Sequence, residues 1–134
     1  MALAMTACGR LTVMPPPDGE PVVLKQAELA TTWTDADGGT LTLKRDGTFT
    51  ADKVCVAIDW EDSLTWSGTG TWNQGSPEEQ SYVGVTFDAA HPEMGVRKPD
   101  SYSALRHGEV LKLWVPVGDP DLDYPNCVLT SPAS

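Results

Sequence analysis

The chain has 134 residues, of which 40% are hydrophobic and 21% are charged, enough for one domain with a buried core but not for two. Its formal net charge of −10 repels phosphate groups, which argues against nucleic acid as a partner. No stretch is apolar over the length that a helix needs to span a bilayer.

The N-terminal residues carry an isolated cysteine. Met5-Thr6-Ala7-Cys8-Gly9 resembles a bacterial lipobox, in which a signal peptidase cuts before a cysteine that is then diacylated. The resemblance implies that residues 1–8 are the remnant of a signal peptide. It also implies an extracytoplasmic protein whose partner is the membrane, through a lipid anchor at Cys8 on the outer face of the cell membrane. The alternative is a floppy N-terminus with a free thiol.

Proline dominates the segment that follows. Residues 9–28 contain Pro15-Pro16-Pro17 and Pro21, which oppose helix formation and favour extended polyproline conformations. We therefore predict a flexible linker over 9–28 and a folded domain over 29–134, with an ordinary disordered terminus as the alternative.

The folded part opens with a hairpin pattern. A first strand from Leu29 carries Trp33, and Gly38-Gly39 permits a tight turn into a strand over Thr40–Lys44. Asp46-Gly47 predicts a second tight turn, which leads into a strand starting at Thr48. Asp35 and Asp37 flank the first turn and are predicted to help form it.

Alternation continues through the middle of the chain. Every second residue from Val54 to Trp60 is apolar, so the third strand continues after a bulge near Asp52, and a loop or short helical turn follows. The fourth strand is expected at Ser67–Trp72, a polar loop at 73–80, and the fifth strand at Ser81–Phe87.

The last third adds a hairpin and a closing strand. Residues 88–100 form a longer connection, either a single helical turn or a lid over one end of a barrel. His107-Gly108 joins strands at 101–106 and 109–115, and 126–130 closes the series. About eight short antiparallel strands predict an all-β, up-and-down barrel, because closure removes exposed edges; a sandwich is the alternative.

Two cysteines remain inside the predicted domain. In such a barrel Cys127 on the last strand can reach Cys55 on the third, so we predict a disulfide between them. The alternative is a pair of buried free thiols in a reducing compartment.

The opening segment also resembles known proteins. A tryptophan on the first strand, a glycine-rich turn and a Gly-then-Phe hairpin make Leu29–Ala51 look like the start of lipocalin and avidin barrels, with Thr31-Thr32-Trp33 at their Gly-x-Trp position. The run Trp33–Phe49 followed by Ser67–Trp72 is similar to small lipoproteins of actinobacteria. This resemblance covers most of Leu29–Thr130 and implies an envelope address but no activity.

Few residues suggest chemistry. Asp119, Asp121 and Asp123 have the spacing of a calcium loop but lack its glycine and glutamate, so a solvated acidic turn is expected. His91 and His107 have no second ligand at metal spacing. We therefore predict no catalytic residues, no metal, no cofactor and no enzyme activity.

Aromatic residues are the best candidates for a ligand site. Five tryptophans are many for this length. Trp33 and Trp72 are interpreted as core residues or barrel-end plugs, and Trp60, Trp66 and Trp114 as either core or the apolar lining of a ligand pocket. The candidate pocket residues are Trp33, Trp60, Trp66, Trp72, Trp114, Tyr82 and Tyr102.

The sequence therefore predicts a monomeric, membrane-tethered, non-enzymatic module that binds a small apolar ligand or an envelope partner, with a tryptophan-lined cavity open at one end. The alternative is a structural or inhibitory module with a filled barrel that acts through surface contact. An enzyme would need a polar cleft with a histidine or a carboxylate pair, and ranks last.

Overall fold

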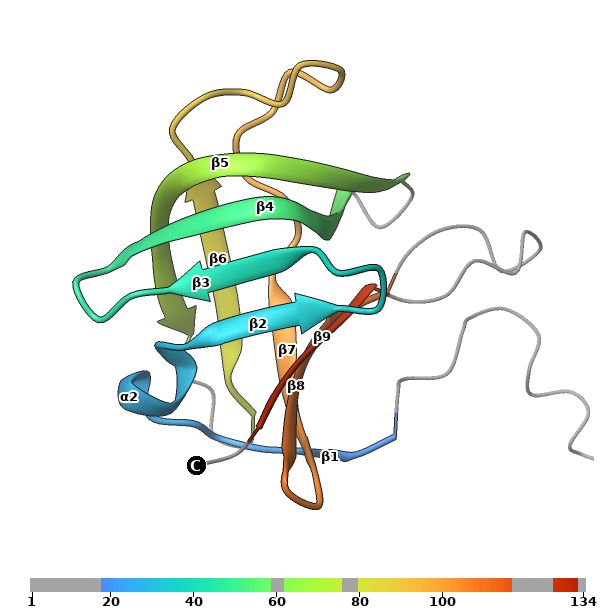
Figure 1. Ribbon diagram of the computed structural model, residues 1–134. Coiled ribbons are helices and arrows are strands. Elements are labelled where there is room, and N and C mark those ends of the chain that lie inside the picture. Colours follow the sequence, from blue (N-terminus) through green and yellow to red (C-terminus); the bar gives the residue numbers. More distant parts are fainter. Residues whose placement is uncertain (1–17, 59–61, 76–79, 117–126, 133–134) are drawn as a thin grey trace, which may run out of the picture.

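The computed structural model describes residues 18–58, 62–75, 80–116 and 127–132, and strands β2 to β9 close there into an antiparallel barrel (Figure 1). The elements are β1 (Glu20–Pro21), α2 (Gln26–Leu29), β2 (Thr32–Asp35), β3 (Thr40–Leu43), β4 (Thr48–Ile58), β5 (Asp62–Gly75), β6 (Tyr82–Phe87), β7 (Tyr102–His107), β8 (Val110–Val115) and β9 (Cys127–Pro132).

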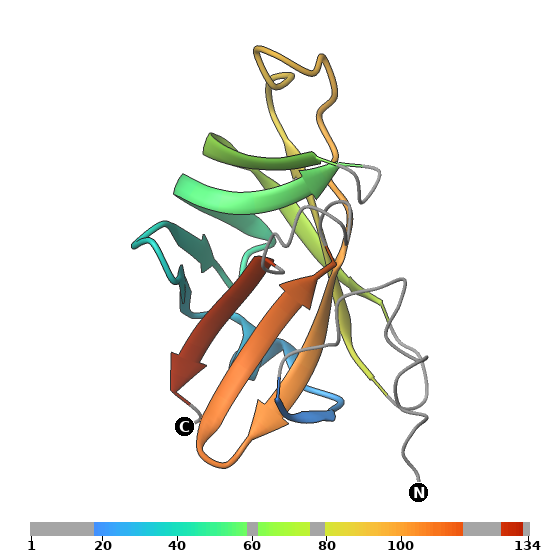
Figure 2. The same cartoon turned by 90° about the vertical axis from the view of Figure 1, so that its right-hand side faces the viewer.

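Neighbours in the barrel are neighbours in sequence. Each strand from β2 to β8 pairs with the next one, and β9 returns to β2 with Thr34 opposite Thr130. Figure 1 shows β2 to β5 running across the view with β6 behind them, and Figure 2 shows β7, β8 and β9 side by side. The predicted up-and-down barrel is confirmed, and the sandwich alternative is wrong.

The period-two pattern directs apolar side chains into one core. On β3, Leu41 and Leu43 are each 1% exposed, whereas Thr40 and Thr42 are half-buried. Successive side chains of a strand point to opposite faces, so alternate residues of β2, β3 and β8 enter this interior in the same way. The interior is thus occupied by a continuous cluster of buried apolar side chains.

The predicted bulge in the third strand is confirmed. The register of β4 against β5 shifts between Ala51 and Val54, and Lys53 has a φ of 54°. The Lys53 N–H donates to Ser67 Oγ on β5 at 2.9 Å. Because the bulge adds one residue to β4, the side chain of Val54 points into the barrel interior, where it is fully buried.

Strand β5 is longer than the predicted 67–72 strand, and it replaces the loop expected before residue 67 and part of the loop expected after Trp72. Its first part pairs with β4 and its last part with β6, so it bends from one side of the barrel to the other (Figure 1). Gly70 lies where the two pairings meet, and a Cβ there would lie 2.0 Å from the Thr86 carbonyl oxygen. Glycine therefore permits this close corner.

The segment before β2 differs from the predicted linker. Residues 18–28 lie against the barrel: β1 pairs with β7, and the Val22 N–H donates to the Ala104 carbonyl oxygen at 3.3 Å. Leu24 and Leu29 are 1% and 0% exposed. Their burial stabilises a folded conformation of this segment despite the preference of its prolines for an extended chain, so the folded domain includes residues before 29. The first strand begins at Thr32 rather than at Leu29, because residues 26–29 are helical.

Candidate functional site

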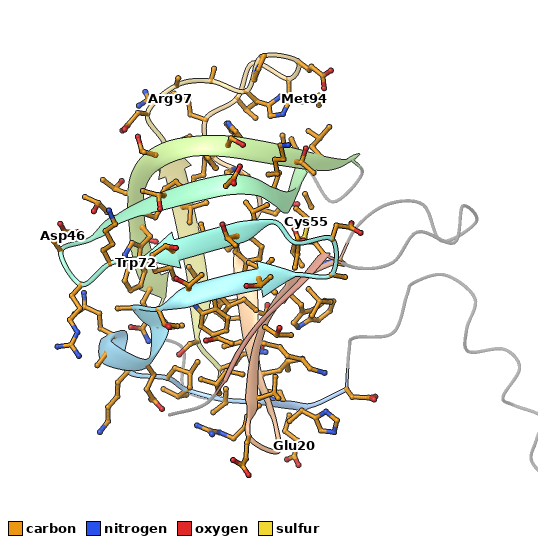
Figure 3. All side chains as sticks on the ribbon, in the orientation of Figure 1. Glu20, Asp46, Cys55, Trp72, Met94 and Arg97 are labelled. Atoms are coloured by element: carbon orange, nitrogen blue, oxygen red, sulfur yellow. A yellow bond between two sulfur atoms is a disulfide. The ribbon has the colours of Figure 1, made fainter. Side chains whose placement is uncertain are left out.

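The connection over residues 88–100 lies at one end of the barrel and forms no helix (Figure 1). Its ends are fixed by backbone hydrogen bonds, from Phe87 N to the Arg97 carbonyl oxygen at 2.8 Å and from Asp100 N to the Ala57 carbonyl oxygen at 2.9 Å. Met94 and Arg97 mark it in Figure 3, above the strands. The loop is therefore attached both to β6 and to β4.

An aromatic cluster lies under this loop. The rings of Trp66 and Phe87 stack with centroids 3.8 Å apart and planes at 1°, and Phe49 meets Phe87 edge-on at 4.9 Å. The His91 ring meets Trp66 edge-on at 4.9 Å. Trp66 and Phe87 are 5% and 1% exposed, so the cluster continues the core to the end of the barrel.

His91 ties the loop to β5. Its Nδ1 accepts the Glu93 N–H at 3.1 Å, so Nε2 carries the proton and donates to the Thr65 carbonyl oxygen at 3.3 Å. The side chain is 6% exposed. Both ring nitrogens are thus used inside the protein, which indicates a structural role.

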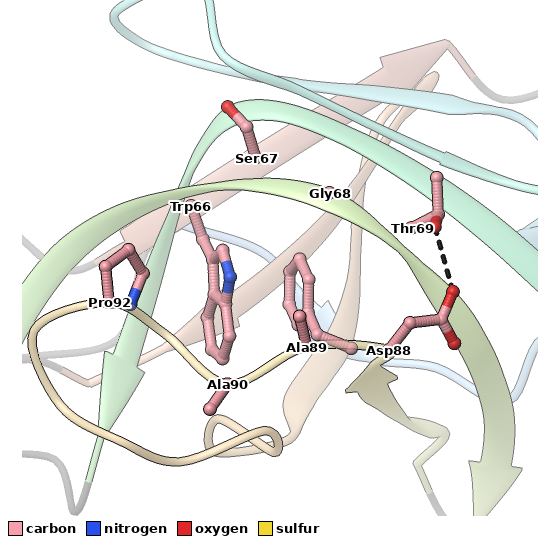
Figure 4. Close-up of a pocket in the computed structure, with 9 residues that line it drawn as sticks. Trp66, Ser67, Gly68, Thr69, Asp88, Ala89, Ala90 and Pro92 are labelled. Carbon is pink, nitrogen blue, oxygen red and sulfur yellow. Dashed lines mark hydrogen bonds between the residues drawn. The ribbon is translucent and has the colours of Figure 1, made fainter.

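A cleft of about 330 Å³ lies between β5 and the start of this loop (Figure 4). The Thr69 Oγ1–H donates to Asp88 Oδ2 at 2.9 Å at one side of it, while the Ser67 side chain points to the opposite side of β5 from the Trp66 ring. The volume is at the lower limit of small-molecule sites. The cleft is lined by Trp66, Ser67, Gly68, Thr69, Phe87, Asp88, Ala89, Ala90 and Pro92.

A second cluster surrounds the buried carboxylate of Asp35, which is 9% exposed. Its Oδ1 accepts the N–H groups of Asp37 and Gly39 at 2.9 and 2.7 Å. Its Oδ2 accepts the Cys55 N–H, from β4, at 2.9 Å. Asp35 thus forms the predicted turn and also joins that turn to another strand.

Tyr102 and the disulfide complete this second cluster. The Tyr102 hydroxyl donates to the Cys55 carbonyl oxygen at 2.9 Å, and burial, with the nearby charge of Asp35, raises the pKa of Tyr102. The Cys55–Cys127 disulfide joins β4 to β9 with Cα atoms 5.8 Å apart, which confirms the predicted pairing (Cys55 is marked in Figure 3). Because these polar groups bond to one another, the cluster is structural.

Two of the predicted pocket tryptophans lie in the core. Trp33 is fully buried and its indole N–H donates to the Leu29 carbonyl oxygen at 3.0 Å. Trp72 is 7% exposed and donates to the Lys44 carbonyl oxygen at 2.8 Å. Their indole N–H groups are thus satisfied within the protein, as expected for barrel-end plugs.

The other predicted pocket residues are dispersed. Tyr102 lies in the Asp35 cluster, Tyr82 is 39% exposed, and Trp114 is half-buried, with an indole N–H that has no partner in the described residues. Of the predicted set that the structure describes, Trp66 lines the cleft. Residues Cys8, Trp60, Asp119, Asp121 and Asp123 lie outside the described residues.

Sequence reasoning missed the rest of the cleft. Phe87 ends the predicted fifth strand, and Ala89, Ala90 and Pro92 fall in a connection whose path the sequence does not define. The one available signal is Gly68, two residues after Trp66 on the same face, where the missing side chain makes space for a neighbouring ring; a Cβ there would lie 3.2 Å from the Phe87 ring.

The fold and these clusters define a disulfide-linked, eight-stranded antiparallel β-barrel domain with a buried aromatic cluster. Comparison with protein-family models, with curated proteins and with solved structures finds no match. Within the described ranges, no three His, Cys, Asp or Glu side chains gather as a metal site. Among the helices of the described residues, none has the length and hydropathy needed to cross a membrane.

Proposed function

We propose that the protein is a lipid-anchored, extracytoplasmic, non-enzymatic binding module whose cleft beside Trp66 takes a small apolar group. The observation that carries the proposal is the cleft of about 330 Å³ between β5 and the loop at 88–92. Its lining combines two aromatic rings with two alanines and a proline, and such apolar lining with few polar groups is typical of small-molecule sites.

The lining of the cleft is preorganised. Trp66 is fixed by its stacking on Phe87, and the loop is fixed by the hydrogen bond from His91 to Thr65. A ligand therefore does not have to order these side chains on binding, which reduces the entropic cost of association.

Two features support the proposed lipid anchor and extracytoplasmic localisation. The resemblance of Met5–Gly9 to a lipobox points to acylation of Cys8, and the Cys55–Cys127 disulfide fits an oxidising compartment outside the cytoplasm.

The filled interior of the barrel favours a second candidate function, a module that acts through surface contact. Trp33 and Trp72 occupy core positions, where a ligand cavity along the barrel axis would need space. The two candidates differ in one property: only the binding module requires that the cleft accept a free small molecule.

The cleft can be tested with indole as the probe. We expect saturable chemical-shift changes in the amide signals of residues 66–69 and 88–92 in an NMR titration. Ala90→Leu places a larger side chain in the cleft and should weaken the binding at least about tenfold, a loss of about 1.4 kcal/mol. Ala27→Leu makes the same change at an exposed alanine of α2, at the other end of the barrel, and should leave binding unchanged.

Two outcomes would contradict the proposal that the cleft binds a small apolar molecule. If the wild-type protein shows no saturable shifts in these two segments, the binding-module proposal is rejected in favour of a module that acts through surface contact. Equal affinity in the wild type and in Ala90→Leu would place the binding elsewhere.

The proposed lipid anchor at Cys8 has a separate test. In a host that processes lipoproteins, intact-mass measurement should show a diacylglycerol-sized addition on a chain that starts at Cys8, and Cys8→Ala should abolish it. An unmodified Cys8 in that host would reject the anchor and leave the cleft unaffected.

A further inference from the structure

One edge of β5 is free of a strand beside the cleft. The pairing of β5 with β6 begins at Gly70, opposite Phe87, and runs to Gly75. Residues 65–69 therefore have β4 on one edge and, among the described residues, no strand on the other. The loop that starts at Asp88 lies along this edge instead.

The direction of the backbone groups on this edge follows from the strand geometry. In a strand, the N–H and C=O of one residue point to the same edge, and successive residues alternate between edges. The carbonyl oxygens of Thr65 and Thr69 both accept hydrogen bonds from the loop, from His91 Nε2 at 3.3 Å and from Asp88 N at 2.9 Å. Ser67, midway between them, therefore directs its N–H and C=O to the loop side.

Ser67 lines the cleft, and no backbone hydrogen bond joins its N–H or C=O to the loop over residues 88–92. Its hydroxyl is used on the other side of the strand, where it accepts the Lys53 N–H. The cleft thus offers one backbone donor and one backbone acceptor next to the rings of Trp66 and Phe87.

The loop limits what can pair with this edge. Its contacts at Thr65 and Thr69 bracket a window of one residue, so a long strand cannot be added. In an antiparallel pair the reciprocal partner of one residue is the N–H and C=O of one other residue. A single extended amino-acid residue with its two flanking amide groups matches this window, and its carbon skeleton would lie against the apolar lining.

The charge around the cleft further restricts the class of ligand that it can bind. The Asp88 carboxylate lines the cleft and is exposed, and the whole chain has a net charge of −10. These charges disfavour a free carboxylate in the cleft and favour a neutral or cationic group. Fatty acids and C-terminal peptide carboxylates are therefore poor ligands for it.

We propose that the cleft binds one extended, neutral, apolar residue of a peptide through reciprocal hydrogen bonds with the Ser67 backbone. This inference rests on the proposed function, since it names the ligand class of the same cleft. In this proposal the affinity comes from the backbone hydrogen bonds with Ser67. The selectivity comes from the negative charge around the cleft, which disfavours ligands with a free carboxylate.

The probe is N-acetyl-leucine N′-methylamide, titrated into the full chain by NMR. We expect saturable binding with a shift of the Ser67 amide signal. Methylation of the leucine nitrogen removes the donor for the Ser67 carbonyl and should weaken binding at least about tenfold. N-acetyl-leucine with a free carboxylate should also bind more weakly than the methylamide.

Protein variants provide a second readout. Ser67→Pro removes the backbone donor at an edge where proline is tolerated, and should abolish binding of the probe. Ser67→Ala keeps that donor and should retain binding, which controls for loss of the hydroxyl. If Ser67→Pro fails to fold, as judged by circular dichroism, the comparison of methylated and unmethylated probes still tests the proposal.

The outcomes separate this inference from the proposed function. If indole binds but the leucine probe does not, or if both leucine probes bind equally, the peptide inference is overturned and the cleft remains a small-molecule site. If neither indole nor the leucine probe binds, both proposals fail. Equal binding of the carboxylate form would overturn the charge selectivity.

Discussion

Removal of the Cys55–Cys127 disulfide, by Cys55→Ala with Cys127→Ala, is expected to lower the free energy of unfolding by about 4 kcal/mol. The bond spans a sequence separation of 72 residues, so its loss releases a long loop in the unfolded chain. Urea denaturation of the wild type and the double variant, followed by tryptophan fluorescence, measures the difference.

The position of this bond explains why the barrel cannot replace it. Cys55 lies on β4 and Cys127 on β9, and these strands are not hydrogen-bonded neighbours. Reduction of the wild-type protein should reproduce the loss, and Cys8→Ala should not, since that cysteine takes no part in the bond. A loss below about 1 kcal/mol in the double variant would contradict the loop-entropy explanation.

Asp35→Ala is expected to destabilise the protein by about 3 kcal/mol or more, because it leaves three backbone N–H groups without their acceptor. A buried donor that loses its partner costs about 1–3 kcal/mol. The hydrogen bond to Gly39 is buried and those to Asp37 and Cys55 are partly buried. The donors belong to Asp37, Gly39 and Cys55, so both the turn after β2 and its contact with β4 are affected. The same urea experiment measures this change.

Asp37→Ala is the matched control, since Asp37 lies in the same turn and its side chain is exposed. It should change the free energy of unfolding by less than about 0.5 kcal/mol. Asp35→Asn should fall between the two, because its oxygen can keep the two bonds to the turn while its amide group faces the Cys55 N–H. Equal stability of Asp35→Ala and Asp37→Ala would show that the buried carboxylate is not a structural link.

Local chemistry made the hairpins predictable. Asp46 Oδ1 accepts both the N–H and the hydroxyl of Thr48, at 2.9 and 2.6 Å, and these hydrogen bonds lower the pKa of Asp46. The whole interaction lies within three residues, at the turn marked by Asp46 in Figure 3. Sequence alone therefore contains the information that places this turn and the strands on either side.

Long-range packing made other features unpredictable. Leu24 and Leu29 follow a proline-rich stretch, and only the end of the finished barrel supplies the surface that buries them. The bond from Asp35 to Cys55 connects residues 20 apart, so turn propensity could identify Asp35 but not its second partner. Each depends on a neighbour that the fold provides.

The candidate site was unpredictable for the same reason. The cleft exists because residues 88–92 run along β5, and that path is set by contacts at Thr69 and Thr65 rather than by local sequence. The tryptophan count suggested an aromatic-lined cavity, but the barrel uses Trp33 and Trp72 to fill its core. Composition thus indicated the chemistry of the site without its position.

The short β1–β7 pairing determines how the molecule would be held by anything attached before residue 18. The chain joins the barrel at Glu20 and Pro21, opposite Arg106 and Leu105, and the loop with the cleft lies at the far end (Figure 1). A tether at the N-terminal side would therefore enter the domain at the end opposite the cleft. Mechanical load on that tether would fall first on this two-residue ladder and would spare the binding end.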